Sequence, residues 1–244
     1  MDILVAGCGT GLSTIELARA RPKVHILAID LSLASLSYAK RMAQRLKVSN
    51  VEFAQADIMN LTSLGRQFDF IDASGVLHHL ADPWEGWRVL LSLLRSGGAM
   101  QVGLYSAVAR RNVVAVRELI AQRAYSPTPA DIRLCREEIM AAPSSLLKSV
   151  TQWSDFFSLS DCRDLLFNVQ EHRVTLPDIK SFVTANGLRF TGFNLPASVV
   201  EQFRARFPDS SAMTNFDCWH AFERDAEATF SSMYQFGVRK SPEQ

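Results

Sequence analysis

The chain lacks any long hydrophobic run. None of its 244 residues belongs to a stretch close to the roughly 18–20 consecutive apolar residues that a membrane helix needs. The N-terminus also lacks the layout of a signal peptide, in which a basic segment precedes a short apolar run. We therefore expect a soluble, cytoplasmic protein.

The chain has only four cysteines, and they are scattered: Cys8, Cys135, Cys162 and Cys218. No C-x-x-C pair occurs, and no histidine accompanies a cysteine at the spacing of a zinc site. This argues against a disulfide framework and against a bound metal. It indicates free thiols in a reducing compartment.

The chain has no excess of either charge, because 26 Lys and Arg against 25 Asp and Glu give a net charge of +1. Nucleic acids and anionic membranes attract proteins with a surplus of positive charge, so neither is expected as a partner. No internal repeat or low-complexity segment occurs. The length suits one large domain or two small ones, with a sizeable core.

One stretch organises the N-terminal half. An apolar run at residues 3–6 predicts a buried parallel strand, three glycines at alternate positions interrupt it, and residues 12–21 favour a helix. At such a helix start, unpaired N–H groups and the helix dipole favour negative charge, and glycines let a ligand approach the backbone. We therefore expect a nucleotide-like ligand beside Gly7, Gly9 and Gly11.

The spacing of these glycines argues against a dinucleotide. The dinucleotide fingerprint is G-x-G-x-x-G, and counted from Gly7 its last position falls on Leu12. An NAD-dependent oxidoreductase is therefore a rival hypothesis that this residue weakens.

Two acidic residues follow the next predicted strands. Asp30 ends the second strand and suits hydrogen bonds to a ribose diol, although it or Ser32 is also placed to cap the next helix. Asp57 follows the short third strand and suits an amino group, while Ile58 offers an apolar face to a flat ring. The alternative for Asp57 is a cap on the following turn.

Strands and helices alternate along the first hundred residues. Further strands are predicted at 68–73 and 99–105, helices at 33–46 and 84–94, and a tight turn at 95–98. Such alternation indicates an α/β fold with a doubly wound parallel sheet. In this architecture ligands bind beyond the carboxyl ends of the strands, so the loops after the strands face one crevice.

Five motifs occur in a distinctive order: Gly7-Cys-Gly-Thr-Gly11, Ile29-Asp30, Ala56-Asp57-Ile58, Val76-Leu-His-His-Leu80 and Arg95-Ser-Gly-Gly98. In this the chain resembles the class I S-adenosylmethionine-dependent methyltransferases, over roughly residues 1–106. The resemblance implies a Rossmann-like sheet of seven strands. Its last strand, at 233–239, would run antiparallel between strands five and six.

The resemblance also implies a cofactor, S-adenosylmethionine, with S-adenosylhomocysteine as its product. In the resembled enzymes the glycine loop approaches the methionine part, the second-strand acid holds the ribose, and the third-strand acid contacts the adenine. The turn after strand four lines the methionine side. The cofactor contacts implied here are Gly7, Cys8, Gly9, Thr10, Gly11, Asp30, Leu31, Asp57, Ile58, Ser74, Gly75 and Val76.

Two later stretches, residues 157–172 and 233–239, are similar to the bacterial methyltransferase subfamily found behind tetratricopeptide-repeat regions. The first predicted strand begins at residue 2 or 3. We therefore expect the chain to be the rear part of a longer protein, with an upstream tetratricopeptide-repeat region as a partner.

Between strands five and six the periodicity changes to that of short helices, predicted near 108–123, 131–141, 144–150 and 161–168. This all-helical insertion, residues 107–175, is expected to cover the crevice and select the substrate, as in the resembled superfamily. One methyltransferase domain, 1–244, is thus predicted. Its cofactor-binding half is 1–106, and strands six and seven lie in 176–244 with further helices, the last at 215–230.

A sulfonium methyl donor is already activated, so methyl transfer depends mainly on holding donor and acceptor in line. A base is needed only where the acceptor is protonated, and His78 and His79, directly after strand four, are the candidates. The alternative is a structural histidine bonded to a neighbouring loop. Arg110 and Arg111 either bind an acidic substrate or start a solvated helix, and residues 170–172 either bond a substrate or close the insertion against the sheet.

The turn after strand four, Ser74-Gly-Val-Leu, differs from the Asn-Pro-Pro-Tyr motif, which argues against methylation of adenine or of glutamine. We favour a small molecule as the methyl acceptor, with a protein side chain as the alternative acceptor. The alternative function is a binding or interaction module that holds the cofactor, or nothing, within a larger repeat protein.

Overall fold

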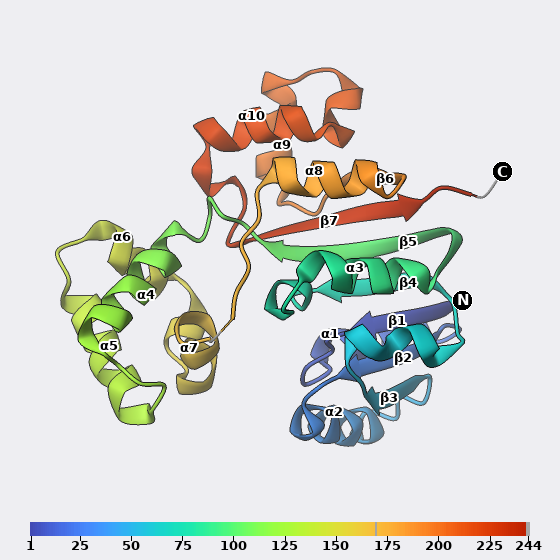
Figure 1. Ribbon diagram of the computed structural model, residues 1–244, viewed down its shortest axis with the longest axis horizontal. Coiled ribbons are helices and arrows are strands. Elements are labelled where there is room, and N and C mark those ends of the chain that lie inside the picture. The colour runs from blue at the N-terminus through green and yellow to red at the C-terminus, as the bar shows by residue number, and fades with distance from the viewer. Residues whose placement is uncertain (169, 243–244) are drawn as a thin grey trace.

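The computed structural model describes residues 1–168 and 170–242, which form a seven-stranded sheet flanked by helices (Figure 1). The strand order is β3-β2-β1-β4-β5-β7-β6. The first five strands are parallel, and β7 runs antiparallel to both β5 and β6, which confirms the predicted α/β class. The strands are β1 Asp2–Ala6, β2 His25–Asp30, β3 Val51–Gln55, β4 Phe68–Ser74, β5 Leu94–Tyr105, β6 Leu188–Phe193 and β7 Met233–Lys240.

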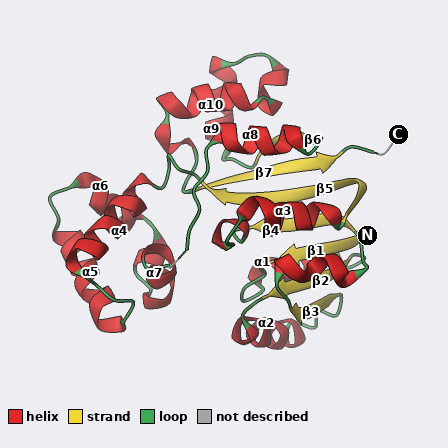
Figure 2. Ribbon diagram, in the orientation of Figure 1, coloured by secondary structure: helices red, strands yellow, loops and turns green. Residues whose placement is uncertain are grey.

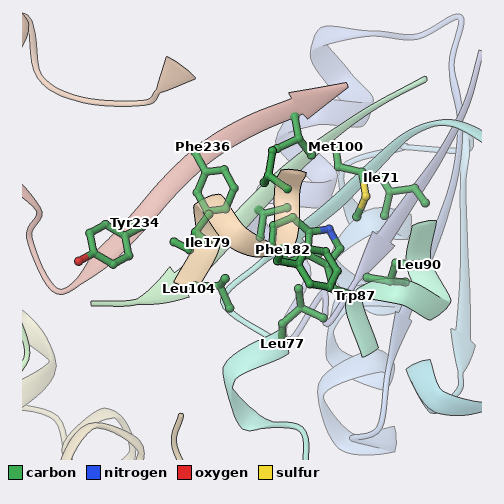
Figure 3. Close-up of a cluster of buried hydrophobic side chains, with 14 of the residues drawn as sticks. Ile71, Leu77, Trp87, Leu90, Met100, Leu104, Ile179, Phe182, Tyr234 and Phe236 are labelled. Atoms are coloured by element: carbon green, nitrogen blue, oxygen red, sulfur yellow. The ribbon is translucent and has the colours of Figure 1, made fainter. Parts of the chain in front are cut away.

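Alternate residues of β1 point into two separate cores, because successive side chains of a strand face opposite sides of a sheet. Ile3 and Val5 pack with helices α1 (Leu12–Ala20) and α2 (Leu33–Arg45), whereas Leu4 belongs to the larger core on the other face. Figure 3 shows part of that larger core, where Trp87 stacks on Phe182 with ring centroids 4.2 Å apart. Burial on both faces explains why this strand is a continuous apolar run.

The larger core is covered by helices that come from both halves of the chain. These are α3 Pro83–Ser92, α8 Leu176–Ala185, α9 Ala197–Arg206 and α10 Phe216–Asp225. Each supplies a fully or nearly fully buried side chain, namely Trp87, Ile179, Phe203 and Trp219.

Four helices lie between β5 and α8 and form a group of their own, beyond the carboxyl ends of β4 and β5. Figure 2 shows this group beside the sheet. The helices are α4 Arg111–Arg123, α5 Pro129–Ala141, α6 Ser145–Lys148 and α7 Leu159–Leu166. They share a separate hydrophobic core whose members include Val113, Val116, Cys135, Ile139, Phe156 and Leu166. Residue 169, within the stretch 157–172 that resembles the repeat-associated subfamily, lies outside the described residues, as do residues 243–244 at the end of the predicted domain.

Two element boundaries differ from the predictions by five residues. Strand β5 begins at Leu94, but its pairing with β4 passes from Phe68–Leu94 to Phe70–Ala99, and Gly97 has a φ of 71°, so the predicted turn at 95–98 is present as a bulge within the strand. Helix α10 ends at Asp225, five residues earlier than predicted. Phe230 is buried and packs edge-on against Tyr234 at 4.7 Å, so the chain must leave the helix before it can enter β7.

Within the described part of the chain, no helix combines the length and the apolar character that crossing a membrane requires.

Candidate functional site

A cavity of about 90 Å³ opens at the carboxyl ends of β1, β2 and β3, where an open α/β sheet binds its ligand. It is lined by Gly7, Ile29, Asp30, Leu31, Ala56, Asp57, Ile58, Val76 and Leu80. The structure therefore brings one end of the glycine bend and both strand-end acids to a single hollow. The lining residues that sequence reasoning missed, Ile29, Ala56 and Leu80, are small or apolar side chains that carry no chemical signal of their own.

Asp30 fastens the glycine loop to the end of β2. Its Oδ2 accepts a hydrogen bond from the Gly9 amide, and its Oδ1 accepts one from the Ser32 amide, both at 2.8 Å. Ser32 caps helix α2, because its hydroxyl accepts a hydrogen bond from the Ser35 amide at 3.2 Å. Because each carboxylate oxygen has a second acceptor position, Asp30 can still receive hydroxyl groups of a ligand.

The glycine loop uses most of its own amides for hydrogen bonds within the protein. The amides of Gly7 and Cys8 both donate to the Ile29 carbonyl, and the Gly11 amide donates to the Cys8 carbonyl. With the Gly9 amide bonded as described above, these four donors are used inside the protein. The positive φ angles of the three glycines, 75°, 53° and 79°, allow this tightly bonded bend.

The cavity is acidic, because two carboxylates and no cationic side chain line it. Asp57 Oδ1 accepts the Met59 amide at 2.9 Å and so caps the following turn, whereas its Oδ2 has no hydrogen-bond partner among the described residues. Carboxylates accept hydrogen bonds from hydroxyl and amino groups and repel phosphate. The lining therefore fits the hydroxyl and amino groups that S-adenosylmethionine offers.

Several predicted cofactor contacts lie outside this cavity. Cys8 is one of them. Burial, with a smaller contribution from Asp30, raises the pKa of its thiol to about 11, so the thiol stays protonated. Gly11 serves helix packing, because a Cβ atom there would lie 2.6 Å from the Ala39 Cβ. The other predicted contacts outside the cavity are Gly9, Thr10, Ser74 and Gly75.

His78 is fully buried behind Tyr105. Their rings stack with centroids 3.5 Å apart, and neither nitrogen of His78 makes a hydrogen bond of good geometry within the described chain. Burial above all, and then the neighbouring His79 and Arg110, lower the pKa of His78 to about 2. An enclosed, neutral imidazole is poorly placed to take a proton from an acceptor, so the geometry favours a structural role for His78.

This burial predicts a pH dependence of folding. The folded protein keeps His78 neutral while the unfolded chain protonates it near its ordinary pKa of about 6.5, so stability falls as pH drops below that value. The loss attributable to His78 is about 1.4 kcal/mol for each pH unit below about 6.5. Urea unfolding between pH 7.5 and 5 should show a shallower pH slope for His78→Leu than for the wild type. The exposed His25 provides the matched control, because His25→Asn should keep the wild-type slope.

His79 is half-buried and faces the end of the insertion. Its Nδ1 lies 3.1 Å from the Gln170 carbonyl oxygen and 3.2 Å from the Asn168 side-chain nitrogen. The tautomer that carries its proton on Nδ1 donates to this carbonyl, which leaves Nε2 as a proton acceptor. Of the two histidines predicted as bases, His79 is therefore the one with a ring nitrogen placed to accept a proton.

Arg110 does not start a solvated helix, and it does not present its charge to solvent. Its side chain is 1% exposed and forms a bidentate ion pair with Glu171, whose side chain is wholly buried; Nε–Oε1 is 2.9 Å and Nη2–Oε2 is 2.7 Å. The neighbouring Arg111 is exposed and pairs with Glu227. Of the two alternatives for residues 170–172, the structure shows the one that closes the insertion against the sheet.

A second hollow, of about 450 Å³, opens between the ends of β5 and β7 and the insertion. We call it the β5–β7 groove, and its lining includes Tyr105, Arg110, Trp153, Asp155, Met233 and Gln235. These residues come from three distant stretches of sequence, which is why no local motif pointed to the groove.

One turn separates the groove from the acidic cavity. Val76 lines the cavity, and a Cβ atom on the adjacent Gly75 would lie 3.8 Å from Met233 Cε. A Cβ atom on Gly103 would lie 2.7 Å from Met233 Sδ. The side chain of Met233, which lines the groove, therefore rests on two glycines beside the cavity.

The sheet order, the glycine bend and the acidic cavity at the ends of β1–β3 together define a class I S-adenosylmethionine-dependent methyltransferase domain. Residues 1–155 match the family described as Methyltransferase domain, and the chain belongs to that family. S-adenosylmethionine is accordingly the cofactor of this domain.

Known proteins resemble the chain to different extents. A protein of Synechococcus sp. is 31% identical over 211 residues, which are 79% of this chain and 48% of that protein. The 27-O-demethylrifamycin SV methyltransferase of Amycolatopsis mediterranei is 33% identical over 102 residues, 41% of this chain and 37% of the enzyme. The chain thus spans less than half the length of these two relatives.

Among solved structures, PKMT2 from Rickettsia typhi in complex with AdoHcy superposes with a TM-score of 0.75 at 16% identity. The superposition covers 98% of this chain and 49% of the other, and at this identity it establishes a shared fold.

Proposed function

We propose that the chain transfers the methyl group of S-adenosylmethionine to a small-molecule acceptor bound in the β5–β7 groove. The observation that carries this proposal is the position of the groove, one turn away from the acidic cavity through Val76, Gly75 and Met233. Its volume of about 450 Å³ also lies within the range of about 300–1,000 Å³ that is typical of small-molecule sites.

In this proposal the chain acts mainly by positioning. The bound cofactor supplies an electrophilic methyl group on a sulfonium. Asp30 and Asp57 would hold its adenosyl part, and the wall formed by the half-buried Tyr105 and Met233 would orient the acceptor. Holding two reactants in line lowers the barrier by several kcal/mol, on the order of 7–11 in favourable cases.

Two wider features of the parent protein are also proposed. The Synechococcus protein is about twice as long as its part that matches this chain, which supports a further region such as the tetratricopeptide repeats that the resemblance implies. The four cysteines are free thiols, which supports a reducing, cytoplasmic location.

The test is a screen of metabolites with methyl-labelled S-adenosylmethionine, run on the wild type and on Gln235→Trp. Gln235 is exposed and lines the groove, so an indole there should fill the groove and reduce transfer at least about tenfold, a loss of about 1.4 kcal/mol of transition-state stabilisation. Binding of S-adenosylhomocysteine should stay at the wild-type level. Arg239→Trp, an exposed position on the same strand outside the groove, is the matched control.

Equal transfer by Gln235→Trp and the wild type would remove the groove from the proposal. Transfer to a protein substrate alone would replace the small molecule as acceptor. Cofactor binding without transfer to any acceptor would favour the binding module.

We also propose His79, which lies outside the groove lining and edge-on to Tyr105 with ring centroids 5.7 Å apart, as the base that removes a proton from the acceptor. His79→Ala should lower kcat by about 10²–10⁴, the range for general acid–base catalysis, and leave the Kd for S-adenosylhomocysteine unchanged. The pH profile of kcat distinguishes a base from a merely positioning residue, because the variant should lose the acidic limb that the wild type shows. An unchanged kcat, or a profile that keeps this limb, would rule out the base role.

A further inference from the structure

We infer that the β5–β7 groove selects acceptors that carry a cationic nitrogen, and this inference rests on the proposed function. The groove joins the aromatic side chain of Trp153 to a single carboxylate without a counter-ion, Asp155, whereas the faces of the Tyr105 ring are already covered by His78 and by the Arg110 guanidinium. Aromatic faces and a carboxylate are the two kinds of group that attract an organic ammonium ion.

Asp155 supplies the negative charge. Its side chain is exposed in the short turn between the insertion's helices α6 and α7, and its one described hydrogen bond comes from the Ser154 hydroxyl at 3.1 Å. No Lys, Arg or His of the described chain lies within ion-pair distance of it. It is near enough to Tyr105 to contribute to the raised pKa of that phenol. Its charge is therefore available to a ligand in the groove.

Arg110 is the other charged residue in the lining, and its charge is already neutralised. The bidentate pair with Glu171 occupies Nε and Nη2, and Nη1 donates to the Ser232 hydroxyl at 2.7 Å. The guanidinium also lies 3.6 Å from the centroid of the Tyr105 ring. An anionic acceptor would have to compete with the buried Glu171 carboxylate, whereas a cation meets Asp155 without such competition.

One further cation, Arg117, lies beside the Arg110–Glu171 pair. Arg117 lies 3.6 Å from the same Glu171 carboxylate and donates to the carbonyls of Leu166 and Asn168. It shares the counter-ion of Arg110 and is not part of the groove lining. Two cations therefore share one carboxylate below the groove surface, and among the described residues Asp155 is the one negative side chain that lines the groove itself.

Trp153 provides the apolar and aromatic contact. It is half-buried at the edge of the insertion's core, so its ring is held by packing on one side and borders the groove. A cation against a tryptophan face gains about 0.5–2 kcal/mol in proteins, depending on how far it is removed from water. Trp153 therefore adds to the attraction for an organic cation and also favours a probe with an apolar body.

The experiment compares three probes of equal shape and different charge: phenethylamine, 2-phenylethanol and phenylacetate. Ligand-observed NMR titrations at pH 7 should show phenethylamine binding the wild type about tenfold more tightly than either of the other two, which corresponds to about 1.4 kcal/mol. Asp155→Asn should reduce this preference to within about twofold. Trp153→Leu should weaken both phenethylamine and 2-phenylethanol.

Asp161→Asn removes an exposed carboxylate of the insertion outside the groove and should preserve the wild-type preference. Tighter binding of phenylacetate than of phenethylamine would overturn the inference, because it would mean that Arg110 dominates. So would a preference that survives in Asp155→Asn, or the absence of binding by all three probes.

Titration of S-adenosylhomocysteine in the same samples separates this inference from the proposed function. Cofactor binding without any charge preference among the probes would refute only the cationic acceptor. A charge preference in a protein that fails to bind S-adenosylhomocysteine would refute methyl transfer and leave the groove as a cation-binding site.

Discussion

Asp30→Asn is expected to lower the affinity for S-adenosylhomocysteine by about 10²-fold. One carboxylate oxygen of Asp30 holds the Gly9 amide and the other holds the Ser32 amide, and the same group lines the acidic cavity. The amide replacement points an NH₂ group at one of these N–H donors and removes the charge that strengthens bonds to ligand hydroxyls. Hydrogen bonds to charged groups contribute about 1.5–3 kcal/mol each, so a loss of about 3 kcal/mol is consistent with the expected factor.

Calorimetric titration measures this affinity, and Asp57→Asn is the informative comparison. Asp57 holds only the Met59 amide and does not touch the glycine loop, so its replacement should cost about tenfold, the equivalent of about one hydrogen bond. Far-UV circular dichroism should be the same for both variants. Wild-type affinity in a folded Asp30→Asn protein would contradict the assignment of this cavity to the cofactor.

The sheet and the acidic cavity were largely predictable from sequence, because their signals are local. The apolar run at 3–6, the glycines after it and the acid at position 30 lie within about thirty residues, and a parallel sheet brings such strand ends to one edge. The antiparallel position of β7 followed from the family resemblance. The bonding inside the glycine loop was not predictable, because sequence does not show that the Ile29 carbonyl accepts two of the loop amides.

The groove and the contacts of the insertion were not predictable, because they depend on pairs of residues far apart in sequence. Arg110 and Glu171 are separated by 61 residues, and nothing near either one indicates that the other neutralises it. Asp155 and Met233 meet in one groove only because the insertion packs beside the start of β7. Local periodicity gives helices and strands, whereas such contacts arise from packing between them.

Glu171→Gln should destabilise the protein by about 3–5 kcal/mol. The substitution leaves the Arg110 guanidinium, which is 1% exposed, inside the protein without its counter-ion, and breaking a buried ion pair from one side has this cost. The exposed pair Arg111–Glu227 is a matched control, because its side chains are 56% and 58% exposed and Arg111 is the next residue in the chain. Glu227→Gln should cost less than about 1 kcal/mol in the same urea titration.

The double variant Arg110→Met/Glu171→Met distinguishes stability from positioning. Replacing both charges with apolar groups removes their desolvation penalty, so part of the lost stability should return, and the loss of the carboxylate near Arg117 limits the recovery. The insertion should nevertheless dock less firmly, because the pair joins the start of the insertion to its end beside Tyr105. Faster hydrogen exchange at the amides of Ala107 and Val174, which bond across this junction, would report the loss. A cost for Glu171→Gln no larger than that for Glu227→Gln would show that the buried pair does not hold the insertion in place.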